Sequence, residues 1–319
     1  MTKANKIRIT TNALNILSDF ELNLDTANPE TNKHAVKIIG YGEMSTVFIF
    51  KEKPLAGIAF KRMALFETEA EATYYEKLYL EYHEILSKIG IVTPDYGCHK
   101  VTSRQGKPVL YLSQKLLAPE SICHKLIHTI NIKEANTLLL KVLETMAKVV
   151  KYNAKNPGNE IGLDGQLSNW SFSLNKKDSL RYLDTSTPLM KKNGAEQLDA
   201  NLFLRICPSM LVWVIKLFFL KDVVTRYYNF RLIIIDLIAN LFKEKKQELI
   251  APFLIIANTY LQKNYPQIKS ITEKEIIAYY KEDALIWRIF LLFRKIERFF
   301  RTKILRRPYN LILPGKINR

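Results

Sequence analysis

The sequence predicts an α+β fold in two lobes, a β-rich one followed by a mainly helical one. Runs of β-branched and other apolar residues between 36 and 63 favour strands. Residues 66–89 have helical patterning with no Gly or Pro, and helical patterning dominates after residue 120. A chain of 319 residues is long enough for one large domain or two lobes. The expected division is an N-terminal extension over 1–35, a β-rich lobe over 36–120 and a helical lobe over 121–319.

The first lobe is expected to be a small antiparallel sheet that carries one long helix. Strands are predicted in "AVKIIGYG", "STVFIFK" and, after Pro54, "AGIAFKRM". The helical run from residue 66 ends at Gly90, a common helix terminator. Two further strands flank the turn signal "SRQGKP". Residues 1–33 are polar and show no clear period, which is why we expect them to form an extension.

The second lobe begins with a helix in "NIKEANTLLLKVLETMAKVVKYNAK", which ends at Asn156-Pro157-Gly158. A loop-and-strand region follows, and residues 200–305 read as helix almost throughout. The most apolar run, "MLVWVIKLFFL" at 210–220, is interrupted by Lys216 and is too short to cross a membrane, which takes about 20 apolar residues. We therefore expect it to be a buried helix.

Composition and charge limit the possible functions and partners. The net charge of +17 favours an anionic partner: a nucleotide, a phosphorylated metabolite, nucleic acid or a membrane surface. Three well-separated cysteines form no Cys-x-x-Cys motif, and the N-terminus has no signal-peptide pattern. We expect a cytoplasmic protein, or one held peripherally at a membrane.

The C-terminal segment from Leu285 concentrates positive charge. Glu297 is its one acidic residue, against ten basic ones: Arg288, Arg294, Lys295, Arg298, Arg301, Lys303, Arg306, Arg307, Lys316 and Arg319. Its first part has apolar and basic residues at helical spacing. It is either a lobe helix with a basic outer face or a contact for anionic lipid or an acidic substrate. Nucleic acid is the least favoured partner, because no recognition module accompanies the charge.

The stretch "IIGYGEMSTVF" contains the first candidate site residues. Gly40, Gly42, Ser45 and Val47 fit a hairpin that lies close to a phosphate chain with its backbone N–H groups toward the oxygens. Taken alone, the same stretch suits an ordinary turn between strands. Lys61 ends the next strand-like run and could hold phosphates as a point charge. Such a lysine needs a carboxylate, and Glu76 fits by spacing, with Glu69 on the same helix face as the reserve.

Two carboxylates and an amide follow further along the chain, at sequence spacings that are compatible with a phosphoryl-transfer site. Asp164 and Asn169 stand in the pattern D-x-x-x-x-N, and Asp184 follows a strand-like run fifteen residues later. Phosphoryl transfer needs a carboxylate to orient the acceptor hydroxyl and oxygen ligands to hold Mg²⁺. Asp164 suits the first task, and Asn169 and Asp184 suit the second.

These motifs, in this order over residues 36–190, resemble the protein-kinase-like superfamily, closest to aminoglycoside phosphotransferases and choline kinases or a related uncharacterised bacterial branch. The resemblance implies ATP bound between two lobes, Lys61 paired with a helix glutamate, Asp164 as the base, and Asn169 and Asp184 on magnesium. It also implies a hinge at Gln114-Lys115-Leu116, whose backbone groups would meet adenine. The implied activity is transfer of the γ-phosphoryl group to a hydroxyl of a small-molecule acceptor.

The sequence departs from the family pattern at three places. Ser45 replaces the third glycine, Gly162 stands where a histidine is usual, and Asp184-Thr185-Ser186 replaces D-F-G. None of these changes removes a phosphate or metal contact. They leave two alternatives open: a pseudokinase that binds a nucleotide or protein partner without catalysis, and a basic peripheral membrane protein on a kinase-like scaffold.

Overall fold

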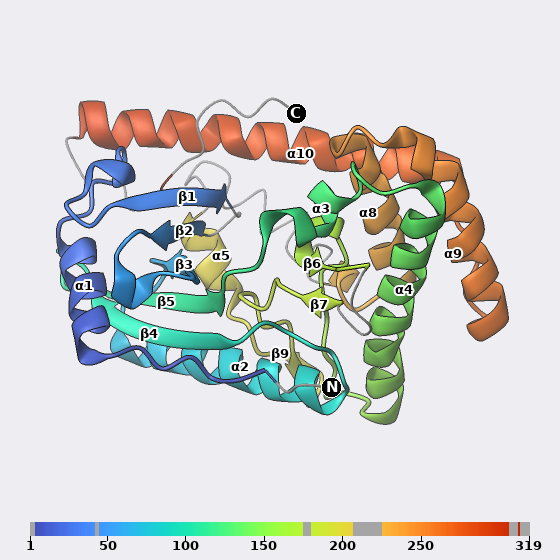
Figure 1. The fold of residues 1–319 in the computed structure, drawn as a ribbon, viewed down its shortest axis with the longest axis horizontal. Coiled ribbons are helices and arrows are strands. Elements are labelled where there is room, and N and C mark those ends of the chain that lie inside the picture. Colours follow the sequence, from blue (N-terminus) through green and yellow to red (C-terminus); the bar gives the residue numbers. More distant parts are fainter. Residues whose placement is uncertain (1–3, 42–44, 175–179, 207–224, 306–311, 313–319) are drawn as a thin grey trace.

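The computed structural model describes residues 4–41, 45–174, 180–206, 225–305 and 312. Its architecture is α+β, as predicted, with the main sheet near one end and a group of helices near the other (Figure 1). The predicted helix at 210–220 and Gly42 lie outside the described residues. In the described part, no helix is long and apolar enough to cross a membrane.

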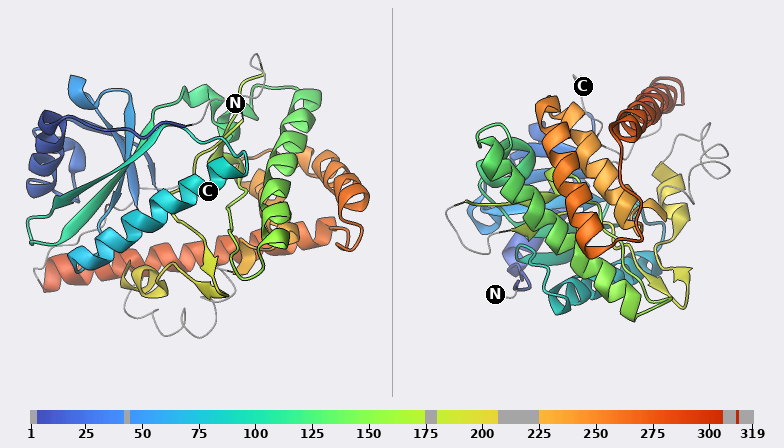
Figure 2. Two further views of the ribbon diagram at one scale, coloured as in Figure 1. Left: turned by 90° about the horizontal axis from the view of Figure 1, so that it is seen from below. Right: turned by 90° about the vertical axis from the view of Figure 1, so that its right-hand side faces the viewer.

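A five-stranded antiparallel sheet forms the core of the N-terminal half, with strand order β1-β2-β3-β5-β4. The strands are β1 (Val36–Tyr41), β2 (Thr46–Phe50), β3 (Ile58–Met63), β4 (Tyr96–Thr102) and β5 (Pro108–Lys115). Helix α2 (Glu69–Lys88) crosses one face of this sheet (Figure 2). Thr68 caps its first turn, and it ends before Gly90, whose φ of 77° suits a residue without Cβ. The predicted strands, turn and helix are confirmed here.

Helix α1 (Thr11–Leu22) covers the opposite face of the sheet and corrects the prediction for residues 1–35. Its buried residues Ala13, Leu17 and Phe20 pack with strand residues such as Phe48 and Phe60. Helix α1 is therefore packed on the sheet and is not part of an extension. Three inward positions at i, i+4 and i+7 among polar neighbours form only a narrow apolar stripe, which the sequence pattern did not make evident.

The second half is mainly helical. Its described elements are α3 (Cys123–Leu126), α4 (Ile132–Lys155), β6 (Trp170–Ser171), β7 (Arg181–Tyr182), β8 (Lys191–Lys192), β9 (Ala195–Glu196), α5 (Ala200–Ile206), α8 (Phe230–Lys243), α9 (Ile250–Asn264) and α10 (Glu273–Phe299). Short 3₁₀ turns lie at Pro29–Thr31, Lys53–Leu55, Pro119–Ser121, Leu167–Asn169 and Gln247–Leu249, and a π-helical turn at Phe300–Ile304 follows α10. Helices α4, α8 and α9 pack together around the largest hydrophobic core (Figure 2).

Helix α10 spans the long axis of the molecule. It starts at a capping box formed by Thr272 and Glu275 and packs against α8. Its other end passes above β1 (Figure 1), where the charge of Arg298 contributes to lowering the pKa of Asp25. The helix therefore connects the helical end of the molecule to the end that holds the sheet.

Candidate functional site

The glycine hairpin and the predicted phosphate-binding lysine lie side by side on neighbouring strands of the sheet. The strand register places Gly40 opposite Val47, Val47 opposite Lys61, and Lys61 opposite Leu112. Ser45, immediately before β2, is half-buried. A Cβ on Gly40 would lie 3.8 Å from Cβ of Val47, an ordinary contact, so crowding within the sheet does not demand a glycine there.

Lys61 reaches from the sheet to Asp184 of the second half. Its Nζ lies 3.0 Å from Asp184 Oδ1 and also donates to the hydroxyl of Ser186. The Ser186 hydroxyl in turn donates to Asp184 Oδ1 at 2.9 Å. Burial opposes ionisation of Asp184, but Lys61 and Ser186 outweigh it and lower the carboxyl pKa. The aspartate is therefore held as an anion beside the lysine.

Two further side chains, Gln114 and Tyr75, hold the segment around Asp184 against the sheet and α2. Gln114 Nε2 donates to the carbonyl of Leu183 at 2.8 Å and to the Thr185 hydroxyl at 3.1 Å. The buried Tyr75 hydroxyl donates to the carbonyl of Ser186 at 2.5 Å. Tyr75, Thr185 and Ser186 were not predicted as site residues, and Gln114 was predicted for its backbone only. No spacing rule identifies them, because the contacts of Tyr75 with Ser186 and of Thr185 with Gln114 join residues 111 and 71 positions apart along the chain.

The predicted pairing of Lys61 with Glu76, or with Glu69, is wrong in this structure. Glu69 pairs with Lys100 of β4 at 2.6 Å, and the charge of Glu76 raises the pKa values of Cys98 and Lys100. The two glutamates do share a helix face, as their spacing predicted. That face lies over β4, because aromatic residues such as Tyr75 occupy the face of α2 turned to the core.

Asp164 and Asn169 lie in one loop, beside the Asp184 segment. Asn169 Nδ2 donates to the Asp164 carbonyl at 3.4 Å, and the Leu183 N–H donates to the Asn169 carbonyl at 2.8 Å. The pairing of β6 with β7 sets this arrangement, since Trp170 is opposite Tyr182 and the residues just outside the ladder then face each other. The structure therefore brings together Asp164, Asn169, Asp184 and Lys61.

Buried tyrosines and a close backbone contact support the loop. The Tyr182 hydroxyl accepts from the Asp164 N–H at 3.1 Å. Burial raises the pKa of Tyr182, and the charges of Asp184 and Asp164 raise it further, so both carboxylates act on one phenol. A Cβ on Gly165 would lie 2.5 Å from Cγ2 of Ile233, so the loop approaches α8 as closely as only glycine allows.

The predicted hinge makes its own hydrogen bonds. The Lys115 N–H donates to the carbonyl of Asp95 at 2.8 Å, and the Leu116 N–H donates to that of Gly57 at 2.9 Å. These two groups therefore do not donate to adenine in this conformation. The prediction that the backbone of residues 114–116 meets adenine is therefore corrected for these two N–H groups. Carbonyl groups of loops beside the sheet already accept hydrogen bonds from these donors at the end of β5.

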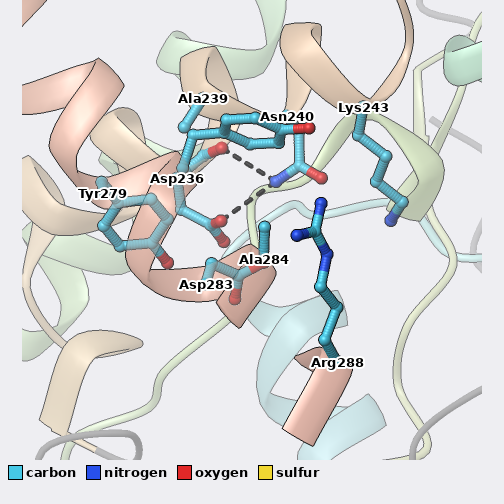
Figure 3. Close-up of a pocket in the computed structure, with 9 residues that line it drawn as sticks. Asp236, Ala239, Asn240, Lys243, Tyr279, Asp283, Ala284 and Arg288 are labelled. Atoms are coloured by element: carbon cyan, nitrogen blue, oxygen red, sulfur yellow. Dashed lines mark hydrogen bonds between the residues drawn. The ribbon is translucent and has the colours of Figure 1, made fainter. Parts of the chain in front are cut away.

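A small pocket lies away from these residues, between α8 and α10 (Figure 3). Asp236, which lines it, is buried and accepts hydrogen bonds from Gln166 at 3.2 Å and from Asn240 at 3.0 Å. Burial raises the pKa of Asp236 to about 6, and the charge of Asp283 adds to the effect. Because the Gln166 N–H donates to Asp164 Oδ1, the pocket is linked to the candidate site through one glutamine.

The donor set suits a hard cation held jointly with a ligand. Asp184 offers a carboxylate that is 25% exposed, and Asn169 offers a half-buried amide oxygen. Mg²⁺ is commonly bound by one or two carboxylates together with substrate phosphates and water. Across the residues that the structure describes, no group of three or more His, Cys, Asp or Glu side chains forms a metal site made of protein ligands alone. A magnesium ion at Asp184 and Asn169 would need further ligands, such as phosphate or water.

The chain belongs to a family described as a family of unknown function (DUF6206), whose model matches residues 22–300. The matched range extends from the last residue of α1 into the π-helical turn after α10. It therefore includes the sheet, the candidate site and the full length of α10. A comparison with curated proteins finds no match.

Proposed function

We propose that this member of the DUF6206 family is an ATP- and Mg²⁺-dependent phosphotransferase of the protein-kinase-like type, acting on a hydroxyl-bearing small molecule. The observation that carries the proposal is the contact of Lys61, on the third strand, with Asp184, which follows the Asp164–Asn169 loop. Kinases place the phosphate-binding lysine on the third strand and a metal-binding aspartate after the catalytic loop. The residues involved are separated by 123 positions along the chain, so the fold brings them together.

Each residue has a role in this proposal. Lys61 binds the α- and β-phosphates, and Asp184 with Asn169 holds the magnesium. Asp164 orients the acceptor hydroxyl and accepts its proton as the bond from the acceptor oxygen to the γ-phosphorus forms and the bond from that phosphorus to the β-phosphate oxygen breaks, so that ADP leaves. Magnesium held by Asp184 and Asn169 would neutralise charge on the phosphates, while the protein would supply mainly position and electrostatic stabilisation.

The helix glutamate has no part in the proposed site. Ser186 takes over some of its positioning role, since its hydroxyl contacts both the lysine and the aspartate. Tyr75 of α2 holds Ser186 through the backbone carbonyl. In this chain α2 would therefore position the lysine indirectly, through a tyrosine and a serine.

The experiment is calorimetric titration of ATP, with and without Mg²⁺, into the wild-type chain and Asp184→Ala. We expect magnesium-dependent binding in the wild type and its loss in the variant. Glu84→Ala, which removes an exposed carboxylate on α2, is the matched control and is expected to bind as the wild type does. Absence of ATP binding to the wild-type chain would contradict the proposal.

A second candidate is a pseudokinase that binds nucleotide without catalysis. Its supporting observation is that Lys61 and Ser186 both contact Asp184 Oδ1, so the lysine already neutralises the proposed metal ligand. ATP binding of equal strength with and without Mg²⁺, and unchanged in Asp164→Ala, would favour this candidate over the enzyme.

A further inference from the structure

The second half of α10 has an unusual distribution of polarity for a surface helix. Its outward face exposes large apolar side chains among basic ones: Leu285, Ile289, Leu292 and Phe299, together with Phe300 of the following turn, are between 41% and 58% exposed. Its inward face contains a charged residue, since Arg294 is only 4% exposed and its guanidinium lies 4.2 Å from the ring centroid of Phe290. A helix that simply covers a core shows the opposite pattern, with apolar residues inside and charges outside.

The exposed apolar residues lie along one stripe of the helix. The positions 285, 289, 292 and 299 are spaced by four, three and seven residues, which places them on one face at 3.6 residues per turn. Ile304 and Leu305, 56% and 57% exposed, continue the apolar surface into the π-helical turn. We call this surface, from Leu285 to Leu305, the α10 stripe.

Basic side chains accompany the α10 stripe. Arg288, Lys295 and Lys303 are exposed along the same length of helix. Over residues 285–305 the sequence has Glu297 as its only carboxylate. The whole chain carries a net charge of +17, so the stripe is an apolar surface in a strongly positive environment.

We propose that the α10 stripe binds the surface of a membrane that contains anionic lipid, with α10 lying in the plane of the interface. Helices of this kind insert their apolar side chains at the boundary of headgroups and acyl chains, while basic residues contact anionic headgroups. The 27 residues of α10 are within the usual length of such helices.

Charge decides against a second copy of the chain as the occupant. Two copies meeting through this stripe would bring two sets of Arg288, Lys295 and Lys303 together, with Glu297 as the only carboxylate in each segment. Like charges facing each other at an interface are unfavourable. An anionic bilayer satisfies the apolar and the basic residues at once.

The test is sedimentation of the full-length chain with vesicles of phosphatidylcholine, with and without added phosphatidylserine, at low and high salt. We expect binding that requires phosphatidylserine and weakens as salt increases. Leu292→Glu should abolish it. Lys295→Glu/Lys303→Glu should weaken it by more than about thirtyfold: the loss of two basic residues near an anionic surface accounts for about thirtyfold, and the two new negative charges add to it.

Matched variants on other helices and loops control for charge and hydrophobicity. Ile255→Glu changes an apolar residue of α9 that is 67% exposed, and Lys263→Glu/Lys269→Glu reverses two exposed lysines outside α10. Both should bind vesicles like the wild type, and circular dichroism should show equal helix content in all variants.

Three results would overturn the proposal. One is the absence of vesicle binding, and another is equal binding to vesicles with and without phosphatidylserine. The third is a wild-type dimer, detected by light scattering, that Leu292→Glu converts to a monomer, since this result would assign the stripe to a second copy. Because the experiment contains no nucleotide, its outcome is independent of the phosphotransferase proposal.

Discussion

Two neighbouring residues of β3, Lys61 and Arg62, each pair with a carboxylate, yet their surroundings differ. Arg62 and Glu21 have side chains that are only 6% and 2% exposed, and two hydrogen bonds of 2.6 and 2.7 Å join them. The Tyr111 hydroxyl donates to the same carboxylate at 2.6 Å. The side chains of Lys61 and Asp184 are 23% and 25% exposed. The Lys61 ammonium and the Ser186 hydroxyl both contact the same oxygen of Asp184, Oδ1.

Strand alternation separates the two pairs. Successive side chains of β3 point to opposite faces, so Arg62 turns to α1 and Lys61 turns to the Asp184 segment. The Arg62 pair is enclosed within the lobe and has its hydrogen bonds satisfied by protein. The Lys61 pair remains open to solvent, where a ligand can compete for it. The first pair therefore has a structural role, and the second is accessible for the phosphate- and metal-binding role that we propose for it.

Removing one partner of the enclosed pair is expected to have the largest effect. Glu21→Ala leaves the buried Arg62 guanidinium without its counter-ion, and we expect a loss of about 3–5 kcal/mol in the free energy of unfolding. Urea denaturation followed by circular dichroism measures it. The double variant Glu21→Leu/Arg62→Met should recover much of this loss, because it leaves no unpaired charge. A loss below about 1 kcal/mol in Glu21→Ala would contradict the structural role.

Asp236 is a third carboxylate, buried and hydrogen-bonded to side-chain amides, and its effect on stability is expected to depend on pH. Its folded-state pKa of about 6 is above the ordinary value of 3.8, so the folded state binds the proton more tightly than the unfolded state does. Its contribution to stability is therefore fully present below pH 3.8 and is lost as the pH rises through 6. We expect Asp236→Asn to gain about 2–3 kcal/mol relative to the wild type between pH 4 and pH 7.

Urea denaturation at a series of pH values measures this relative gain. Asp199→Asn, at an exposed carboxylate, is the control and should give a curve parallel to the wild type. Parallel curves for Asp236→Asn as well would show that Asp236 is not a destabilising charge at neutral pH.

Lys61→Met tests the open pair. We expect it to change the free energy of unfolding by only about 1 kcal/mol, since the pair is partly exposed and screened by water. It should nevertheless abolish magnesium-dependent ATP binding in calorimetry. Arg62→Met, one residue away, is expected to do the reverse, with a large loss of stability and ATP binding retained while the protein is folded. Equal effects of Lys61→Met and Arg62→Met on stability and on ATP binding would contradict the different roles given to the two pairs.

The smallest effect is expected from Glu76→Gln. Because the Lys61 ammonium contacts Asp184 and Ser186, and Glu76 is a half-buried residue of α2, neutralisation of Glu76 should change stability by less than about 0.5 kcal/mol. The ATP titration should match the wild type. A tenfold or greater loss of ATP affinity would show that α2 moves on binding and brings Glu76 to the lysine, as the family resemblance implies.

The sequence alone determined the local elements and the order of the candidate residues. Alternation of apolar residues predicted the strands of the sheet, and long uninterrupted runs predicted α2 and α4, because both patterns depend on near neighbours. The spacing of Asp164, Asn169 and Asp184 was informative for a similar reason: a short loop and the two-strand ladder of β6 with β7 place them together.

Only the tertiary structure determined which charged residues pair with each other. The partner of Lys61 is 123 residues away and that of Arg62 is 41 residues away, distances at which periodicity holds no information. Helix α1 packs on the sheet through its narrow apolar stripe, and Glu69 of α2 pairs with Lys100 of β4 while aromatic residues fill the inner face of α2. The outward orientation of the α10 stripe was likewise decided by packing: an amphipathic sequence specifies two faces, and only its neighbours determine which one faces the solvent.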